Sequence, residues 1–243
     1  MSEARRPATR LEREDRIVTL TLDRPETLNA YDKTMRDEIF ATLEWLHREP
    51  EVSVLVVRGE GRAFSTGGDL NEFGTAPSPV RAREVRQVRD VWRLWSTLPC
   101  VSLAAVHGYA VGGGLEMALL CDFLVCTTDA RFALPETGLG LIPGVGGTQT
   151  LPRAIGLSRA ASVLLAGEWI DGREAARIGL ALEAVPPSRL LTTARRLARR
   201  LASADPRLLR AAKQCVRRGI DLPLADGLRL ERRIGSAIGP REQ

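Results

Sequence analysis

Residues 100–128 constrain the fold of this chain more than any other stretch. CVSLAAVHG (100–108) has the apolar, β-branched composition of a strand, GGGLEMALLC (112–121) that of a helix and DFLVCTT (122–128) that of a second strand. A strand, a helix and a strand in this order predict a parallel βαβ unit with a right-handed crossover. We therefore expect an α/β fold.

The preceding segments extend this alternation. Strands are predicted at 16–22 and at 52–59, and the continuously apolar sequence VSVLVVRG of the second indicates burial on both faces. Between them lies a predicted helix over about 32–48, with Asp32 placed to cap its start. Its buried face is marked by residues at helical spacing: Met35, Ile39, Leu43 and Leu46.

The remainder of the chain is predicted to be mainly helical. After a loop at 71–79, one further helix is marked by Val85, Val88, Trp92 and Trp95. Beyond about residue 145 helices dominate, and the last pattern begins with Asp205 as a cap and Pro206 in the first helical position. No linker interrupts the chain, so we expect residues 1–187 to form one core and 188–243 a C-terminal helical region.

Composition indicates a folded protein outside the membrane. Of the 243 residues, 44% are hydrophobic and 27% are charged. No apolar run approaches the ~20 residues of a membrane span, and the longest candidate, 115–126, contains Glu116 and Asp122. The N-terminus MSEARRPATRLERED is polar and does not resemble a secretory signal. A cytoplasmic location is therefore expected.

The net charge of +5 favours a polyanionic partner such as nucleic acid, a membrane surface or a phosphate-rich cofactor. The arginine-rich stretches at 81–89 and 195–200 alternate with Val and Leu at helical spacing, which favours solvated helix faces. Aromatic residues are only 5% of the chain and offer no stacking platform, so nucleic acid is not the expected partner. The four cysteines lack metal-ligand spacing and are expected to be buried thiols.

Three consecutive glycines suggest an anion-binding turn. A strand leads into Gly112, Gly113 and Gly114 and then into a helix, whose first N–H groups have no acceptor within the helix and lie at the positive end of its dipole. A dinucleotide-binding fingerprint would require GxGxxG here, and the segment lacks it. The turn is therefore suited to an anion other than a dinucleotide.

One glutamate follows this glycine turn directly, and a second lies in another glycine-containing turn further along the chain. Glu116 is in the first turn of the predicted helix, and Glu136 lies in the turn LPETGLG. Two carboxylates beside an anion-stabilising turn can divide acid and base roles if their environments separate their pKa values. The alternatives are structural: Glu116 as a surface residue that complements the helix dipole, and Glu136 as an ordinary turn carboxylate.

Three segments together resemble the crotonase, or enoyl-CoA hydratase/isomerase, superfamily. They are RAFSTGGDL (62–70), HGYAVGGGLEMALLCDF (107–123) and RFALPETGLGLIPGVGGTQTLPRAIG (131–156). The resemblance extends in order and spacing over residues from about 15 to 235. It implies a spiral of ββα units with a C-terminal helical trimerisation region, and an enzyme that handles acyl-CoA thioesters.

The resemblance also assigns catalytic roles. It makes the N–H groups of Gly68 and Gly113 donors to the thioester oxygen, with Gly68 replacing an alanine that is commoner in the family. Glu116 then positions water for attack at C3, and Glu136 supplies the proton to C2. Having both glutamates favours hydration of a 2-enoyl-CoA to a 3-hydroxyacyl-CoA. The alternatives are a Δ3,Δ2-enoyl-CoA isomerase, which needs chiefly Glu136, another acyl-CoA reaction, and an RNA-binding or scaffold protein of a different class.

The family binds coenzyme A as part of the substrate. The resemblance makes Arg24, Arg62, Ser65 and Thr66 the expected contacts to it. Glu26 stands where many relatives carry a basic residue, which weakens one expected phosphate contact. No metal or redox cofactor is implied.

The resemblance further implies a homo-oligomer, either a trimer or a hexamer. Relatives usually continue beyond this C-terminus with a last helix that helps to cover coenzyme A. His107 matches a structural turn position and His47 is expected on an exposed helix face, so neither histidine receives a catalytic role.

Overall fold

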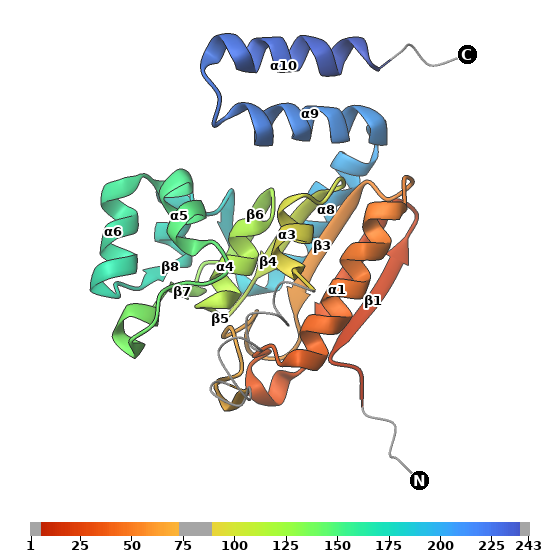
Figure 1. Ribbon diagram of the computed structural model, residues 1–243. Helices are drawn as coiled ribbons and strands as arrows, with labels where there is room; N and C mark the ends of the chain where they lie inside the picture. Colours follow the sequence, from red (N-terminus) through yellow and green to blue (C-terminus); the bar gives the residue numbers. More distant parts are fainter. Residues whose placement is uncertain (1–5, 73–88, 239–243) are drawn as a thin grey trace.

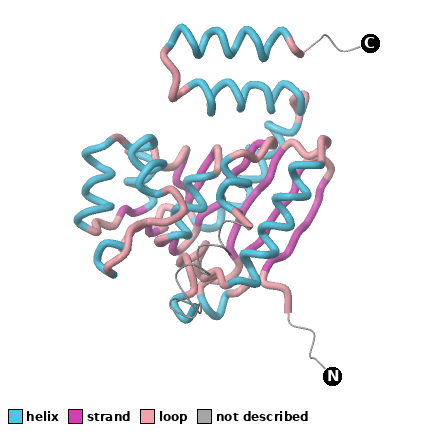
Figure 2. Tube along the Cα trace, viewed as in Figure 1, coloured by secondary structure: helices cyan, strands magenta, loops and turns pink. Residues whose placement is uncertain are grey.

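A computed structural model describes residues 6–72 and 89–238 of the chain. Two β-sheets form its centre and helices surround them (Figures 1 and 2). The larger sheet has the strand order β1-β2-β3-β4-β6-β9, and the smaller sheet has the order β5-β7-β8. The described residues contain no helix that is long and apolar enough to cross a membrane. The predicted α/β class is confirmed.

In the larger sheet β1 and β2 form an antiparallel hairpin, and every other neighbouring pair is parallel. Its strands are β1 (Thr9–Glu14), β2 (Ile17–Leu22), β3 (Val54–Gly59), β4 (Val101–Val106), β6 (Phe123–Thr127) and β9 (Glu183–Val185). The smaller sheet consists of β5 (Tyr109–Val111), β7 (Arg131–Ala133) and β8 (Ile170–Asp171). The parallel β4-α4-β6 unit is the one predicted from residues 100–128.

The α-helices follow the sequence pattern closely. Those within the described residues are α1 (Lys33–Arg48), α3 (Val91–Ser96), α4 (Gly113–Leu120), α5 (Gly147–Ile155), α6 (Leu157–Ala166), α7 (Gly172–Arg177), α8 (Leu190–Ala202), α9 (Pro206–Gly219) and α10 (Leu224–Ser236). The predicted cap of α1 is confirmed, because Asp32 Oδ1 accepts a hydrogen bond from the Met35 N–H at 2.8 Å. The cap of α9 is also confirmed, with Asp205 accepting from the Arg207 N–H at 2.9 Å.

Strand β3 shows why its sequence is apolar at consecutive positions. Leu55 and Val57 belong to the main core, which also contains the buried face of α1 and much of α4. Val54 and Val56 point to the opposite face and pack in a second cluster with residues of α8. The strand is therefore buried on both faces, as predicted.

Some expectations were wrong or incomplete. Strand β1 was not predicted because its residues are polar and mostly exposed; it forms as an edge strand through a tight turn at Asp15, whose φ is 52°. The short strands β5, β7, β8 and β9 were also missed. His47 is half-buried rather than exposed, with Nε2 2.9 Å from the Leu94 carbonyl oxygen. Val85 and Val88 lie outside the described residues.

Helices α9 and α10 extend from one end of the molecule, and α10 packs on α9 away from the sheets (Figure 1). No residue of α9 is fully buried, so the helix is attached mainly by three cations on one face. Arg210 donates to carbonyl oxygens that include Val52 at 3.1 Å, Lys213 to Cys100 O at 2.7 Å and Arg217 to Leu120 O at 3.1 Å. Charged hydrogen bonds thus hold this helix on the core.

Asp122, immediately before β6, takes part in these contacts. Its carboxylate accepts from the Ser102 N–H at 2.8 Å and pairs with Lys213 at 2.7 Å and Arg217 at 2.9 Å. The Asp122 and Lys213 side chains are only 12% and 10% exposed. Removing one partner of such a pair leaves the other charge poorly solvated.

Asp122→Ala is therefore expected to lower the free energy of unfolding by about 2–3 kcal/mol. Denaturant unfolding followed by circular dichroism measures the change. The control is Glu14→Ala, which removes an exposed pair with Arg199 and should change stability little. An Asp122→Ala protein that unfolds at the wild-type denaturant concentration would show that the cations bind the backbone equally well without the carboxylate.

Candidate active site

Two glycine-containing segments meet at the start of α4. Ser65 forms an isolated parallel bridge with Ala110, and the Val111 N–H donates to the Ser65 carbonyl at 3.0 Å. A Cβ on Gly114 would overlap that carbonyl, and a Cβ on Gly67 would lie 2.9 Å from the Gly113 nitrogen. Only residues without side chains permit this approach.

No described residue outside α4 accepts a hydrogen bond from the N–H groups of Gly68 and Gly113, which lie near this junction. The Tyr31 N–H donates to Gly67 O at 2.8 Å and the Asp69 N–H donates to Tyr31 O at 3.0 Å. In a parallel bridge of this kind the central residue, Gly68, directs its own N–H away from the partner strand. The Gly113 N–H lies in the first turn of α4, where no acceptor exists within the helix.

Glu116 lies inside the protein beside this helix start. Its residue exposure is 2%, so the alternative of a surface glutamate is wrong. Oε1 accepts hydrogen bonds from the Val145 N–H at 2.8 Å and the Gly147 N–H at 2.7 Å, at the N-terminus of α5. Burial raises the pKa of Glu116 above its usual value, while the N–H donors of Gly147 and Val145 oppose that shift. These donors hold the carboxylate form in one orientation.

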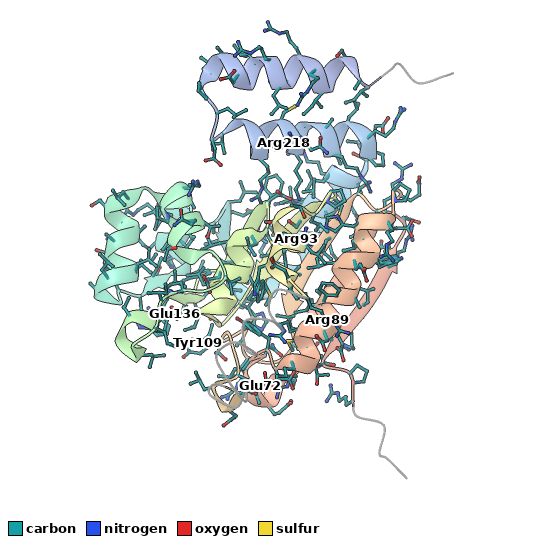
Figure 3. All side chains as sticks on the ribbon, in the orientation of Figure 1. Glu72, Arg89, Arg93, Tyr109, Glu136 and Arg218 are labelled. Atoms are coloured by element: carbon teal, nitrogen blue, oxygen red, sulfur yellow. The ribbon has the colours of Figure 1, made fainter. Side chains whose placement is uncertain are left out.

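Glu136 approaches the same turn from the 3-10 helix η3 (Glu136–Leu139). Its Oε1 lies 2.9 Å from the point where a Cβ on Gly112 would stand, which shows that the carboxyl group faces the glycine turn. Oε2 is buried and accepts no hydrogen bond from the described residues. Figure 3 shows Glu136 on the side of the body away from Arg218, which lies on α9.

The environment of Glu136 favours its protonated form. Burial raises the pKa of Glu136, its own backbone N–H opposes the shift, and the charge of Glu116 raises the pKa further. Glu116 has two backbone donors to stabilise its charge, whereas the described residues provide none to Glu136 Oε2. The two carboxyl groups therefore sit in environments suited to different roles.

The four residues expected to contact coenzyme A have different surroundings. Ser65 is buried, and its hydroxyl donates to Asn29 O at 2.8 Å and accepts from the Gly67 N–H at 3.1 Å. Thr66 is half-buried, with Oγ1 3.5 Å from the carbonyl oxygens of Thr27 and Leu28. Both hydroxyls thus bond to backbone that holds the glycine segment.

The two arginines of this set also differ. Arg24 is mostly buried, donates to Ala30 O at 2.6 Å and pairs with Asp69 at 3.3 Å. Arg62 is exposed. The contacts already made by Arg24 would have to be shared with a phosphate, while the Arg62 side chain is open to solvent. A role in binding coenzyme A stays a prediction for all four residues.

Sequence reasoning missed several groups of the site. The amides of Val145 and Gly147 hold Glu116, and only the pair of glycines in GVGG marked this loop as special. Tyr31 was missed entirely, although a Cβ on Gly113 would overlap its hydroxyl. No motif in the sequence indicates that Tyr31 lies beside the glycine turn.

Three of the four cysteines are poorly suited to act as nucleophiles. Burial raises the pKa of Cys100 to about 11, and that of Cys121 and Cys126 to about 12, so these thiols stay protonated near neutral pH. Cys215 is half-buried, so the prediction of buried thiols holds for the other three. Within residues 6–72 and 89–238, no group of three or more His, Cys, Asp or Glu residues is arranged to hold a metal ion.

Two N–H donors beside two carboxyl groups suit proton transfer next to a carbonyl. The donors can stabilise negative charge on a carbonyl oxygen, and the carboxyl groups can move protons at neighbouring carbons. Because the donors belong to the backbone, they need no reorganisation when the charge develops.

Known proteins are similar to this chain over most of its length. Residues 12–242 match the family model for enoyl-CoA hydratase/isomerase. The 2,3-dehydroadipyl-CoA hydratase of Escherichia coli is 37% identical over 233 residues, covering 95% of this chain and 89% of that protein. The crotonyl-CoA hydratase of Syntrophomonas wolfei is 34% identical over 223 residues, covering 91% of this chain and 85% of that protein.

Solved structures agree with the sequence matches. An enoyl-CoA hydratase from Bacillus anthracis superposes with a TM-score of 0.90 at 32% identity, covering 95% of this chain and 90% of that one. The predicted crotonase-like fold, including helices in the C-terminal region, is therefore confirmed. The chain belongs to the enoyl-CoA hydratase/isomerase family of enzymes, the crotonase superfamily.

Proposed function

We propose that this enzyme hydrates a 2-enoyl-CoA thioester to a 3-hydroxyacyl-CoA. The observation that carries the proposal is that Glu136 faces Gly112, while Glu116 lies in the first turn of the helix that Gly113 begins and its charge acts on Glu136. The hydratase names of relatives at 34–37% identity support the same reaction. The acyl-CoA substrate would place its thioester carbonyl at the junction of the two glycine segments.

In the proposed mechanism, the N–H groups of Gly68 and Gly113 donate to the thioester oxygen. Glu116 takes a proton from water as the water oxygen attacks C3, and negative charge develops on the thioester oxygen. Glu136 then gives its proton to C2, which restores the carbonyl. Loss of one such oxygen-stabilising donor costs about 2.7–4 kcal/mol of barrier.

The surroundings of the two glutamates support this division of roles. The Val145 and Gly147 donors favour the charged form of Glu116, as a base requires. Burial raises the pKa of both groups, but the charge of Glu116 also acts on Glu136 and no described residue donates to Glu136 Oε2, so Glu136 is the better suited of the two to hold a proton. A Δ3,Δ2-enoyl-CoA isomerase would need chiefly Glu136, so the careful positioning of Glu116 favours hydration.

Substrate contacts outside the reacting atoms are part of the proposal. Arg62 would meet a phosphate of coenzyme A from the exposed surface, and Arg24, Ser65 and Thr66 would contribute directly or by shaping the glycine loop. No metal or redox cofactor enters the proposed reaction. An RNA-binding role would instead use arginine faces such as that of α8, whose Arg195, Arg196, Arg199 and Arg200 are all exposed.

One experiment separates these functions. The protein is incubated with crotonyl-CoA, longer 2-enoyl-CoAs and 3-enoyl-CoAs, and the products are identified by mass and chromatography. A 3-hydroxyacyl-CoA formed from a 2-enoyl-CoA supports hydration, whereas a 2-enoyl-CoA formed only from a 3-enoyl-CoA supports isomerisation. Turnover of neither class would overturn the proposed function.

We also infer that the chain forms trimers, which can pair as hexamers. The family resemblance predicts this state, and large apolar side chains are exposed on α9, α10 and the turn between them: Leu208, Val216, Ile220, Leu222, Leu224 and Leu228. Sedimentation equilibrium at micromolar concentration is expected to give three or six chains per particle. A monomer alone under these conditions would contradict the inference.

A further inference from the structure

Tyr31 is attached through its backbone to the segment that carries Gly68. Its N–H donates to Gly67 O at 2.8 Å, and its carbonyl accepts from the Asp69 N–H at 3.0 Å. These two hydrogen bonds flank Gly68 and fix the direction of its N–H. The backbone of Tyr31 therefore positions the first proposed donor.

The side chain of the same residue contacts the second donor segment. A Cβ on Gly113 would overlap the Tyr31 hydroxyl and would lie 2.9 Å and 3.0 Å from ring atoms Cε1 and Cζ. The ring is thus in van der Waals contact with Gly113. This contact gives a reason for glycine at position 113 that the sequence did not reveal.

Aromatic neighbours restrain the ring from its other side. Tyr31 makes an edge contact with Trp92 on α3, with ring centroids 5.4 Å apart and an interplanar angle of 60°. Trp92 in turn stacks on Trp95 at 6.5 Å, and Trp95 is only 1% exposed. The core therefore supports Tyr31 against Gly113.

We propose that Tyr31 is a positioning residue that sets the separation and orientation of the Gly68 and Gly113 N–H groups. This inference rests on the proposed function, because it concerns the two donors to the thioester oxygen. A preorganised donor pair stabilises the transition state only if both groups lie about 2.7–3.1 Å from the developing oxyanion. Without the Tyr31 side chain, Gly113 and the Gly68 loop can move relative to each other. The value of kcat should therefore fall by a larger factor than KM rises.

Tyr31→Ala is expected to lower kcat for hydration at least about tenfold, with KM changed by less than about threefold. Tyr31→Phe keeps the ring and Tyr31→Leu fills part of the space, so kcat should decrease in the order Tyr, Phe, Leu, Ala. Thermal unfolding of each variant identifies any variant that fails to fold. If Tyr31→Ala does not fold, the kcat values of wild type, Tyr31→Phe and Tyr31→Leu still test the expected order.

The chain offers a matched control. Tyr109, labelled in Figure 3, is the other tyrosine, and it also makes an edge contact with a tryptophan, Trp169, at 6.4 Å. Its side chain is exposed rather than wedged against a glycine. Tyr109→Ala should leave kcat within about twofold of wild type.

A second measurement reports on the donors without turnover. Butyryl-CoA with an isotope-labelled carbonyl is saturated and is not hydrated, and infrared difference spectra give its carbonyl stretch when it is bound. Wild type and Tyr109→Ala should lower this frequency relative to free butyryl-CoA, because two N–H groups polarise the carbonyl. Tyr31→Ala should recover part of the free frequency.

The two measurements separate the two proposals. If wild type hydrates no enoyl-CoA, the proposed function fails, and the butyryl-CoA spectra alone decide on Tyr31. The proposal for Tyr31 is overturned if Tyr31→Ala keeps the wild-type kcat and carbonyl frequency. It is equally overturned if the wild-type protein does not shift the carbonyl frequency of butyryl-CoA.

Discussion

Glu136→Gln is expected to abolish detectable hydration of 2-enoyl-CoA and any isomerisation of 3-enoyl-CoA. The amide keeps the size of the side chain but cannot exchange the proton at C2, which both reactions require. General acid–base catalysis of this kind supplies about 10²–10⁴-fold in rate, and more is lost if the residue also orients substrate. Steady-state kinetics with both substrate classes measure the loss, and a drop in kcat is its expected form.

Unfolding of the variant does not account for this loss. The pKa of Glu136 is raised in the folded protein, so its contribution to stability is full below the unfolded-state pKa and declines as pH rises through the folded-state pKa. Above the unfolded-state pKa, folding requires Glu136 either to take up a proton or to bury a charge, and a neutral glutamine avoids both costs, so Glu136→Gln should melt at or above the wild-type temperature. The control Glu44→Gln changes an exposed glutamate on α1 and should keep full activity.

Retention of hydration by the Glu136→Gln enzyme would place the proton donor elsewhere. Glu136 would then be the ordinary turn carboxylate that its position after Pro135 also allows. A loss of activity accompanied by a lower melting temperature would instead point to a structural defect, since the burial argument predicts the opposite change.

Local pattern in the sequence predicted the regular parts of the fold. Helix α1 was found because Met35, Ile39, Leu43 and Leu46 recur at helical spacing, and all four are buried. Strand β3 was found because its consecutive apolar residues face two different clusters. Burial repeats with the helical period in α1 and is continuous in β3, so in both cases a short window of sequence contains the signal.

Pairing partners outside that window explain the errors. Strand β1 has a burial pattern that is almost entirely exposed, and it is a strand only because β2 provides hydrogen bonds along its length. The three-residue strands β5 and β7 are likewise defined by pairing to each other rather than by their composition. Hydropathy cannot reveal elements that are stabilised mainly by long-range backbone contacts.

The sequence predicted which segments form the candidate site, but not which residues surround the two glutamates and the glycine turn. The family resemblance indicated Gly68, Gly113, Glu116 and Glu136. Their catalytic roles stay predictions. The burial of Glu116 could not be predicted from its position in the first turn of a helix. The residues that hold it, Val145 and Gly147, lie in the loop that leads into α5 and are distant in the sequence. Tyr31 was missed for the same reason, since its ring and Gly113 are far apart in the sequence and meet only in the folded chain.

Glu116→Gln separates hydration from double-bond migration. The glutamine oxygen can still accept from the Val145 and Gly147 N–H groups, so the loop at the start of α5 is expected to keep its shape. The remaining amide nitrogen cannot take a proton from water. Hydration should therefore fall by about 10²–10⁴-fold, the usual contribution of a general base.

Isomerisation of a 3-enoyl-CoA, where the protein catalyses it, should fall much less in Glu116→Gln, because migration needs proton transfer between C2 and C4 and no attacking water. The ratio of the two activities is measured in one preparation, so differences in folded fraction cancel. The hydratase assignment fails if Glu116→Gln hydrates 2-enoyl-CoA at the wild-type rate. Equal losses of both activities would show that Glu116 holds the structure of the glycine turn rather than acting on water, because only a shared structural role affects both reactions alike.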